Sequence, residues 1–222
     1  MVEYLGKQYI DVDQEFLAPP AHIVAPNLIG CVLLHDNRGV ETGIMLVDDE
    51  GYGGGSDRAF HLHPENRSRR NRGSKNLTPF ATLRIHGYRD MWAIDIVCGK
   101  EGEESTVLVR AGVPVAGMDI MAERRSKPAA ASKTIKECKK GYEKQLCRGP
   151  CSLAEALGIY PLLDGASLLK PPFRLLRPVE PVANLLNGPR VGVTQDKELP
   201  WRWGHPGYSG WVAKKFPQRG AN

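Results

Sequence analysis

The chain has 222 residues, with 30 Lys and Arg against 25 Asp and Glu, and a formal net charge of +5 at pH 7. Hydrophobic residues make up 41% and charged residues 25%, a composition that excludes a disordered or collagen-like chain and favours one globular domain. The chain has no apolar run of the roughly 20 residues that span a membrane and no secretory signal pattern. We therefore expect an intracellular protein with no membrane partner.

The N-terminal half is predicted to combine a broken helix with short strands. Residues 1–14 are polar and predict a loosely ordered arm, followed by a domain over residues 15–222. Residues 16–29 have the apolar spacing of a helix, interrupted at Pro19-Pro20 and again near Pro26. Apolar runs bounded by turn residues predict strands at 31–34, 43–47, 82–85, 92–97 and 105–110. The third and fourth of these strands flank residues 87–90 and predict a hairpin.

The C-terminal half is predicted to begin with helices, over residues 117–126, 133–147 and 151–157. The last of these is opened by Gly149-Pro150 and ended by Gly158, as helix termini favour. From Pro161 onward the proline-rich chain predicts short strands and turns. Because strands and helices are mixed without a regular βαβ rhythm, we expect a single α+β domain.

The most distinctive local pattern is the acidic run Asp48-Asp49-Glu50, which follows an apolar strand and precedes a glycine-rich loop. A strand end would hold a carboxylate at a rigid edge, where Glu50 could act as a general base on water. The alternative is an acidic surface turn before a flexible loop, and composition alone favours that alternative.

Metal and nucleotide sites have weaker support. Gly53-Gly54-Gly55 lacks the Lys-Ser/Thr ending of a phosphate-binding loop. His61 and His63 could share a metal, but no further cluster of Cys or His supplies the other ligands. The run from His63 to Glu65 fits half of a zinc deaminase signature, whose second thiolate is missing after Cys151. We therefore expect no metal and no cofactor.

Basic residues form two runs on either side of the predicted hairpin. The first run contains Arg58, Arg67, Arg69, Arg70, Arg72 and Lys75. The second extends from Arg124 to Arg148. Such runs are usually solvated faces, but cations also neutralise phosphates, and Tyr88 on the hairpin could stack on bases or wedge between them. We assign Arg69, Arg70, Arg72 and Lys75 as candidate contacts to a DNA backbone.

Several motifs, in order and spacing, resemble the alkyladenine (3-methyladenine) DNA glycosylase family. The segment Glu50-Gly51-Tyr52-Gly53-Gly54-Gly55-Ser56-Asp57-Arg58-Ala59-Phe60-His61 is similar to the family's Glu-x-Tyr-x-Gly-x-x-Asp-x-Ala-x-His signature. Further matches are Asn71-Arg72-Gly73, Val107-Leu108-Val109-Arg110-Ala111, Leu146-Cys147-Arg148-Gly149-Pro150 and Pro189-Arg190-Val191-Gly192-Val193. The resemblance extends over roughly residues 16–212.

The resemblance implies a monofunctional enzyme with a curved antiparallel sheet, surrounding helices and a protruding hairpin. It would act as a monomer on double-stranded DNA, flipping out damaged purines of the 3-methyladenine, hypoxanthine and ethenoadenine class. Glu50 would activate the water that cleaves the N-glycosidic bond, and Arg110 would position that water. Tyr52 would stack on the base and His61 would hydrogen-bond the nucleotide. The backbone near Val191 and Val193 would complete these contacts, and an abasic site would remain for base excision repair. Such an enzyme would be cytoplasmic and nucleoid-associated in a prokaryote, or nuclear in a eukaryote.

The hairpin departs from the family pattern in two ways. It is more polar than usual, which leaves two candidates for the residue that fills the gap in the duplex. Chemistry favours Tyr88, whereas the position directly before the glycine favours His86. Asp95 stands where the family usually has an Asn that screens guanine-like bases, and a carboxylate there would either have a raised pKa or accept a proton donor from the base.

Two other functions are compatible with these residues. One is a damaged-DNA-binding module of the same fold that does not cleave, which the altered hairpin motivates. The other is a hydrolase that uses Glu50 on RNA or on free nucleosides.

Overall fold

The computed structural model describes residues 1–53, 56–61, 63, 79–88, 90–100, 105–126 and 141–217. Its strands form one antiparallel sheet in the order β1-β2-β8-β3-β4-β7-β6-β5, with β10 paired to β4 and β9 paired to β10. The strands are β1 Val2–Tyr4, β2 Lys7–Asp11, β3 Val32–Asn37, β4 Val40–Gly53, β5 Leu83–Tyr88, β6 Met91–Cys98, β7 Ser105–Ala116, β8 Phe173–Pro178, β9 Leu186–Gly188 and β10 Arg202–Gly204. The helices are α1 Gln14–Leu17, α2 Ala21–Leu28, α4 Met118–Arg125, α5 Glu143–Leu146 and α6 Pro150–Leu157, with 3-10 turns η3 Pro161–Leu163 and η4 Pro206–Trp211.

The centre of the sheet is β4, a strand of 14 residues. It is paired with β3 and β7 along its length and with β10 at the end that carries the acidic run. Its residues from Gly43 to Gly51 are all buried, which explains why its apolar run is nearly continuous rather than alternating. The carboxylates of the acidic run are therefore inside the protein and not on a surface turn.

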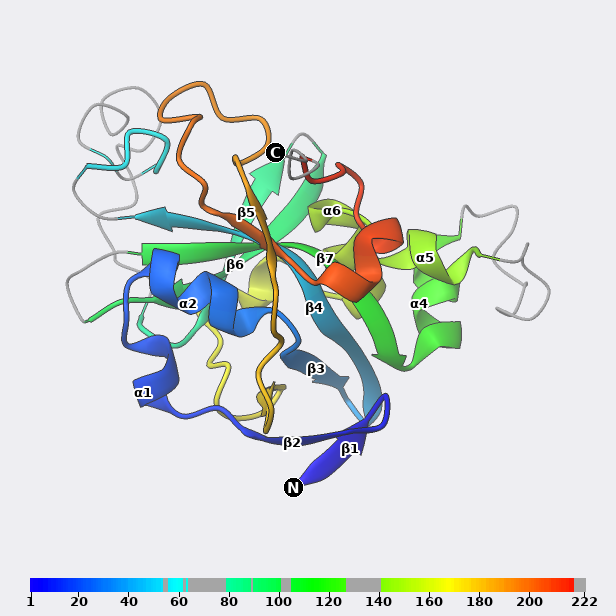
Figure 1. Cartoon of the computed structure of the whole chain (residues 1–222). Helices are drawn as coiled ribbons and strands as arrows, with labels where there is room; N and C mark the ends of the chain where they lie inside the picture. Colours follow the sequence, from blue (N-terminus) through cyan, green and yellow to red (C-terminus); the bar gives the residue numbers. More distant parts are fainter. Residues whose placement is uncertain are drawn as a thin grey trace.

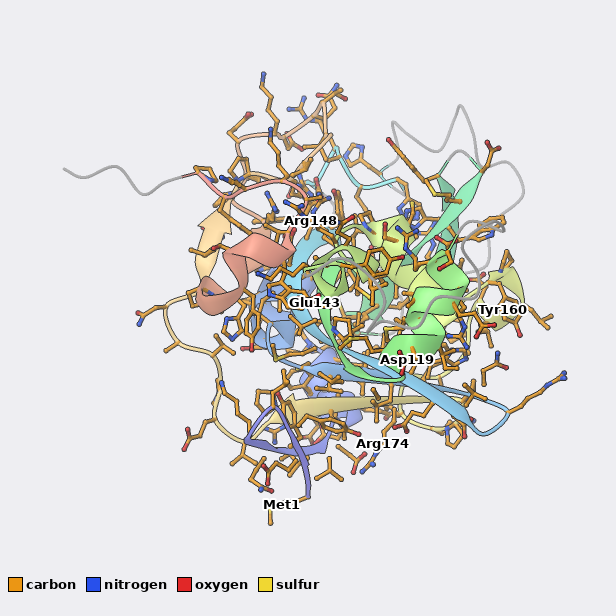
Figure 2. The ribbon with its side chains drawn as sticks, turned by 90° about the vertical axis from the view of Figure 1, so that its right-hand side faces the viewer. Met1, Asp119, Glu143, Arg148, Tyr160 and Arg174 are labelled. Atoms are coloured by element: carbon orange, nitrogen blue, oxygen red, sulfur yellow. The ribbon has the colours of Figure 1, made fainter. Side chains whose placement is uncertain are left out.

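Two apolar clusters hold the layers together. The larger joins the sheet to the helices through residues such as Leu28 of α2, Met121 of α4 and Leu153 of α6. In Figure 1, α1 and α2 lie to the left of β4, and α4 and α5 lie to its right. The smaller cluster includes Tyr9 and Val212, and Arg148 donates to the carbonyl oxygen of Val212 at 3.1 Å. Figure 2 shows Arg148 beside this C-terminal part of the chain.

The expected fold class is confirmed, since the structure is a single α+β domain built on an antiparallel sheet. The hairpin is also confirmed as β5 and β6. Helix α6 begins after Gly149 with Pro150 in its first turn, and Gly158 ends it in the left-handed region at φ +69°. A Cβ on Gly158 would lie 2.7 Å from Cζ of Arg124, so both the backbone and the packing favour glycine there.

Two local predictions are wrong. Residues 2–11 are not a loose arm but strands β1 and β2, because β2 pairs with β8 and buries Tyr9 completely. The division of the chain at residue 14 stays a prediction. Helix α2 also continues through Pro26, since burial of Val24, Ala25 and Leu28 outweighs the one backbone hydrogen bond that Pro26 lacks.

The predicted helix over 133–147 lies mostly outside the described residues, which contain only its end, α5. In the described part of the chain, no helix is long and apolar enough to cross a membrane.

Candidate active site

Glu50 is the centre of the site and is held by donors from three parts of the chain. Its Oε1 accepts the Val191 N–H at 2.7 Å and lies 3.2 Å from Nη1 of Arg110. Its Oε2 accepts the Tyr52 hydroxyl at 2.7 Å. Burial raises the pKa of Glu50 above its ordinary value, although Arg110, Val191 and Tyr52 each act to lower it. A fixed carboxylate with a raised pKa can accept a proton from a water molecule near neutral pH.

Tyr52 and Arg110 therefore meet the same carboxylate from neighbouring strands, β4 and β7. Burial and the charge of Glu50 raise the pKa of Tyr52, so its hydroxyl stays protonated and donates. Arg110 also approaches Asp48, with Nε 3.5 Å from Oδ2. Asp48 is in turn held by Arg202 through two bonds of 2.8 and 2.9 Å. These pairs give two of the three adjacent acids a cationic partner.

A second ion pair supports the loop after β4. Arg190 makes two bonds to Asp57, at 2.7 and 2.9 Å, and both side chains are fully buried. Arg190 also donates to the Gly51 carbonyl at 3.1 Å, and its guanidinium lies 4.6 Å from the centre of the Tyr52 ring. Because Arg190 directly precedes Val191, this pair positions the backbone N–H that binds Glu50.

His61 is placed as a neutral donor. Nη1 of Arg84 lies 3.1 Å from His61 Nδ1, and because a guanidinium only donates, Nδ1 accepts and the ring proton is on Nε2. Burial, reinforced by the charge of Arg84, lowers the pKa of His61 to about 4. Within the described part of the chain, Nε2 is buried and has no hydrogen-bond partner. Such an N–H is suited to an acceptor on a bound ligand.

Strand register places Asp95 and Arg84 on the same face of the sheet as Glu50. Glu50 is opposite Leu108, Leu108 is opposite Asp95, and Asp95 is opposite Arg84. Paired residues of antiparallel strands point to one face, so the four side chains form a row across β4, β7, β6 and β5. Neighbouring strands are about 4.8 Å apart, which separates the backbones at Glu50 and Asp95 by about 10 Å.

The other predicted site residues differ from one another in exposure and in their contacts. Tyr88 is the last residue of β5 and is 56% exposed, whereas His86 turns to Asp95, with Nδ1 3.2 Å from Oδ2. Val193 is half-buried two residues after Val191. Arg69, Arg70, Arg72 and Lys75 lie outside the described residues.

Sequence reasoning missed the ion pairs that support the site. Asp57 and Arg190 both stand in family-like motifs, but nothing in the sequence indicates that they pair across 133 positions. Arg202 and Arg84 carried no signal beyond their charge. Among the described residues, no group of three or more His, Cys, Asp and Glu side chains could hold a metal ion.

Asp49, the middle acid, is expected to destabilise the protein. It is fully buried, and neither of its carboxylate oxygens has a hydrogen-bond partner among the described residues. Burial, with the charges of Asp48 and Glu50, raises its pKa well above the ordinary value. Asp49→Leu, which has a similar shape, should increase the free energy of unfolding by about 1–3 kcal/mol.

The pH dependence separates this cause from a packing effect. The unfolded chain ionises Asp49 at an ordinary pKa, whereas the folded chain retains the proton to a higher pH, so the contribution of Asp49 to wild-type stability falls as pH rises above about 4. Urea unfolding at pH 5 and pH 8 should show a larger gain for Asp49→Leu at pH 8. An equal gain at both values would contradict a titrating Asp49. Asp48→Leu is the matched control and should destabilise, because it leaves Arg202 buried without its partner.

Comparison with known proteins gives one consistent family. The sequence profile described as methylpurine-DNA glycosylase matches residues 15–209. A Rhodopseudomonas palustris protein (strain BisB18) named 3-methyladenine DNA glycosylase is 34% identical over 213 residues, which cover 92% of each chain. Proteins of the same name from Nitrosospira multiformis and Streptomyces avermitilis are 34% and 33% identical, covering 88% and 86% of this chain and 90% and 85% of their own.

Proposed function

The chain belongs to the methylpurine-DNA glycosylase family, and on this premise we propose that it is a monofunctional glycosylase acting on alkylated or deaminated purines in double-stranded DNA. The observation that carries the proposal is the buried Glu50 carboxylate, held by Val191, Arg110 and Tyr52. The substrates are bases of the 3-methyladenine, hypoxanthine and ethenoadenine class. The relatives named above are bacterial, which supports the nucleoid as the proposed place of action.

The reaction needs one water molecule and a flipped nucleotide. Glu50 accepts a proton from the water as the water oxygen bonds to the sugar C1′, while the C1′–N bond breaks and its electron pair leaves with the base. A cationic base such as 3-methyladenine leaves neutral, whereas hypoxanthine or ethenoadenine leaves as an anion that takes a proton from solvent. Arg110 holds Glu50 and orients the water beside it. The Nε2–H of His61 donates to the nucleotide, and the Tyr52 ring stacks on the base. The products are the free base and an abasic site.

The test uses duplexes that carry one hypoxanthine, ethenoadenine or 3-methyladenine, followed by alkaline cleavage at abasic sites. We expect strand cleavage at the lesion and none in the undamaged duplex. No release of any of the three bases with enzyme in excess would overturn the proposal. Tight lesion binding without release would indicate a binding module instead, and faster release from RNA or free nucleosides would indicate a different hydrolase.

Tyr88 is proposed as the residue that fills the gap left in the duplex. It stands at the end of the hairpin and is more than half exposed, whereas His86 is held by Asp95. Tyr88→Ala should weaken binding to a lesion duplex by about 1–3 kcal/mol, because the stacking ring is lost. Fluorescence anisotropy measures the effect, and Tyr88→Phe, which retains the ring, should bind nearly as the wild type does. If His86→Ala weakens binding and Tyr88→Ala does not, His86 is the wedge.

A further inference from the structure

A cluster of charged and polar side chains lies at the far end of the cross-strand row from Glu50. Asp95 is 4% exposed, and its Oδ2 lies 3.2 Å from Nδ1 of His86 and 3.8 Å from Nη1 of Arg84. Arg84 also reaches His61, as described above. The proposed reaction uses His61 but assigns no step to Arg84 or Asp95, and His86 has a role only as the alternative wedge.

The cluster keeps Asp95 ionised. Burial alone would raise the pKa of Asp95, but His86 and Arg84 together bring it below its ordinary value. Burial likewise acts to lower the pKa of His86, and its contact with Asp95 more than offsets this and raises it. An ionised carboxylate only accepts hydrogen bonds. Asp95 could be an ionised carboxylate that accepts hydrogen bonds or a protonated carboxyl. The contacts with His86 and Arg84 favour the ionised acceptor.

The position of Asp95 relative to Glu50 decides which groups of a bound base can donate a hydrogen bond to Asp95. Both are on one face of the sheet, two strands apart, with the half-buried Leu108 between them. When Glu50 is beside the sugar C1′, a purine that extends along the row presents to Asp95 the edge opposite its glycosidic bond. Arg84 and His86 both approach Oδ2, so a donor on that edge would approach Asp95 from the side of Oδ1.

We propose that Asp95, positioned by Arg84 and His86, selects purines with an N–H donor on the edge opposite the glycosidic bond. This inference rests on the proposed glycosylase function and concerns its substrate class. Hypoxanthine and 7-alkylated guanines have such a donor at N1, and the guanines also have an exocyclic amino group. In 1,N6-ethenoadenine the etheno bridge occupies both nitrogens and no donor remains. A buried acceptor left without a donor is costly, so donor-bearing bases are released faster.

The experiment compares single-turnover release of hypoxanthine and ethenoadenine from otherwise identical duplexes. The wild type should release hypoxanthine faster, and Asp95→Asn should reduce the ratio of the two rates by about 10-fold or more, since hydrogen bonds to charged groups are the stronger ones. Asp90→Asn is the matched control, because Asp90 is an exposed acid at the turn of the same hairpin and should leave the ratio unchanged. An unchanged ratio in Asp95→Asn overturns the inference.

Two substitutions of Arg84 test whether it positions Asp95, one that removes its charge and one that retains it. They also test the inference if Asp95→Asn does not fold. Arg84→Met removes the cation beside Asp95 and should reduce the ratio, whereas Arg84→Lys retains the charge and should preserve most of it. Equal ratios in both Arg84 variants and the wild type would also overturn the inference. These outcomes differ from failure of the proposed function, in which the wild type releases neither base.

Discussion

Replacing Glu50 with Gln is expected to lower the rate of base release by about 10²- to 10⁴-fold, the contribution typical of a general base. Glutamine has the same shape and can still accept the Val191 N–H through its amide oxygen, so the fold should be retained. It cannot take a proton from water. The rate constant for abasic-site formation, measured under single-turnover conditions, gives the effect directly.

Two further measurements support this interpretation. Glu155→Gln is the matched control, because Glu155 is a half-exposed glutamate of α6 that pairs with Arg125 away from the Glu50 carboxylate. It should retain the wild-type rate. In the wild type, the rate should fall as pH decreases through the raised pKa of Glu50, because the reaction needs the ionised carboxylate. A Glu50→Gln variant that releases base at the wild-type rate would refute the assignment of Glu50 as the base.

The largest expected loss of stability comes from breaking the buried pair of Asp57 and Arg190. Asp57→Asn should decrease the free energy of unfolding by about 3–5 kcal/mol, because it leaves the Arg190 charge buried without its counter-ion. Chemical denaturation measures this loss. Since Arg190 also contacts the Tyr52 ring and directly precedes Val191, base release should slow as well.

Asp11→Asn is the matched control for this prediction. Asp11 binds Arg174 through two bonds of 2.6 and 2.9 Å, the same type of paired contact, but the two side chains are 63% and 46% exposed. Figure 2 shows Arg174 near the end of the molecule where Met1 lies. Solvent screens this pair, so its loss should cost less than about 1 kcal/mol. Similar losses in both variants would mean that burial does not determine the strength of the Asp57 pair.

Elements whose ends are encoded locally were predictable from the sequence. Helix α6 has its proline start and glycine end within ten residues, and the β5–β6 hairpin has its two strands on either side of a short turn. Strand β2 was not predictable in this way. Its polar residues form a strand only because β8, more than 160 positions later, provides the hydrogen-bond partners and a site that buries Tyr9.

In the candidate site, too, some features are encoded locally and others depend on distant segments. The order of its motifs in the sequence was enough to assign the family and to select Glu50, Tyr52, His61 and Arg110. The partners of these residues come from distant segments, since Val191 reaches Glu50 from 141 positions away.

The acidic run Asp48-Asp49-Glu50 shows most clearly what the sequence determined and what the tertiary structure determined. The sequence alone determined that three carboxylates follow one another at the centre of a strand. Only the tertiary structure decided their states: Asp48 is paired with Arg202, Asp49 has no partner among the described residues and a strongly raised pKa, and Glu50 is held by three donors. The reason is physical, because the pKa of a carboxyl depends on its burial and on the charges and donors around it. For these residues, both arise only when β4 pairs with β7 and β10 and the segment at Val191 reaches Glu50.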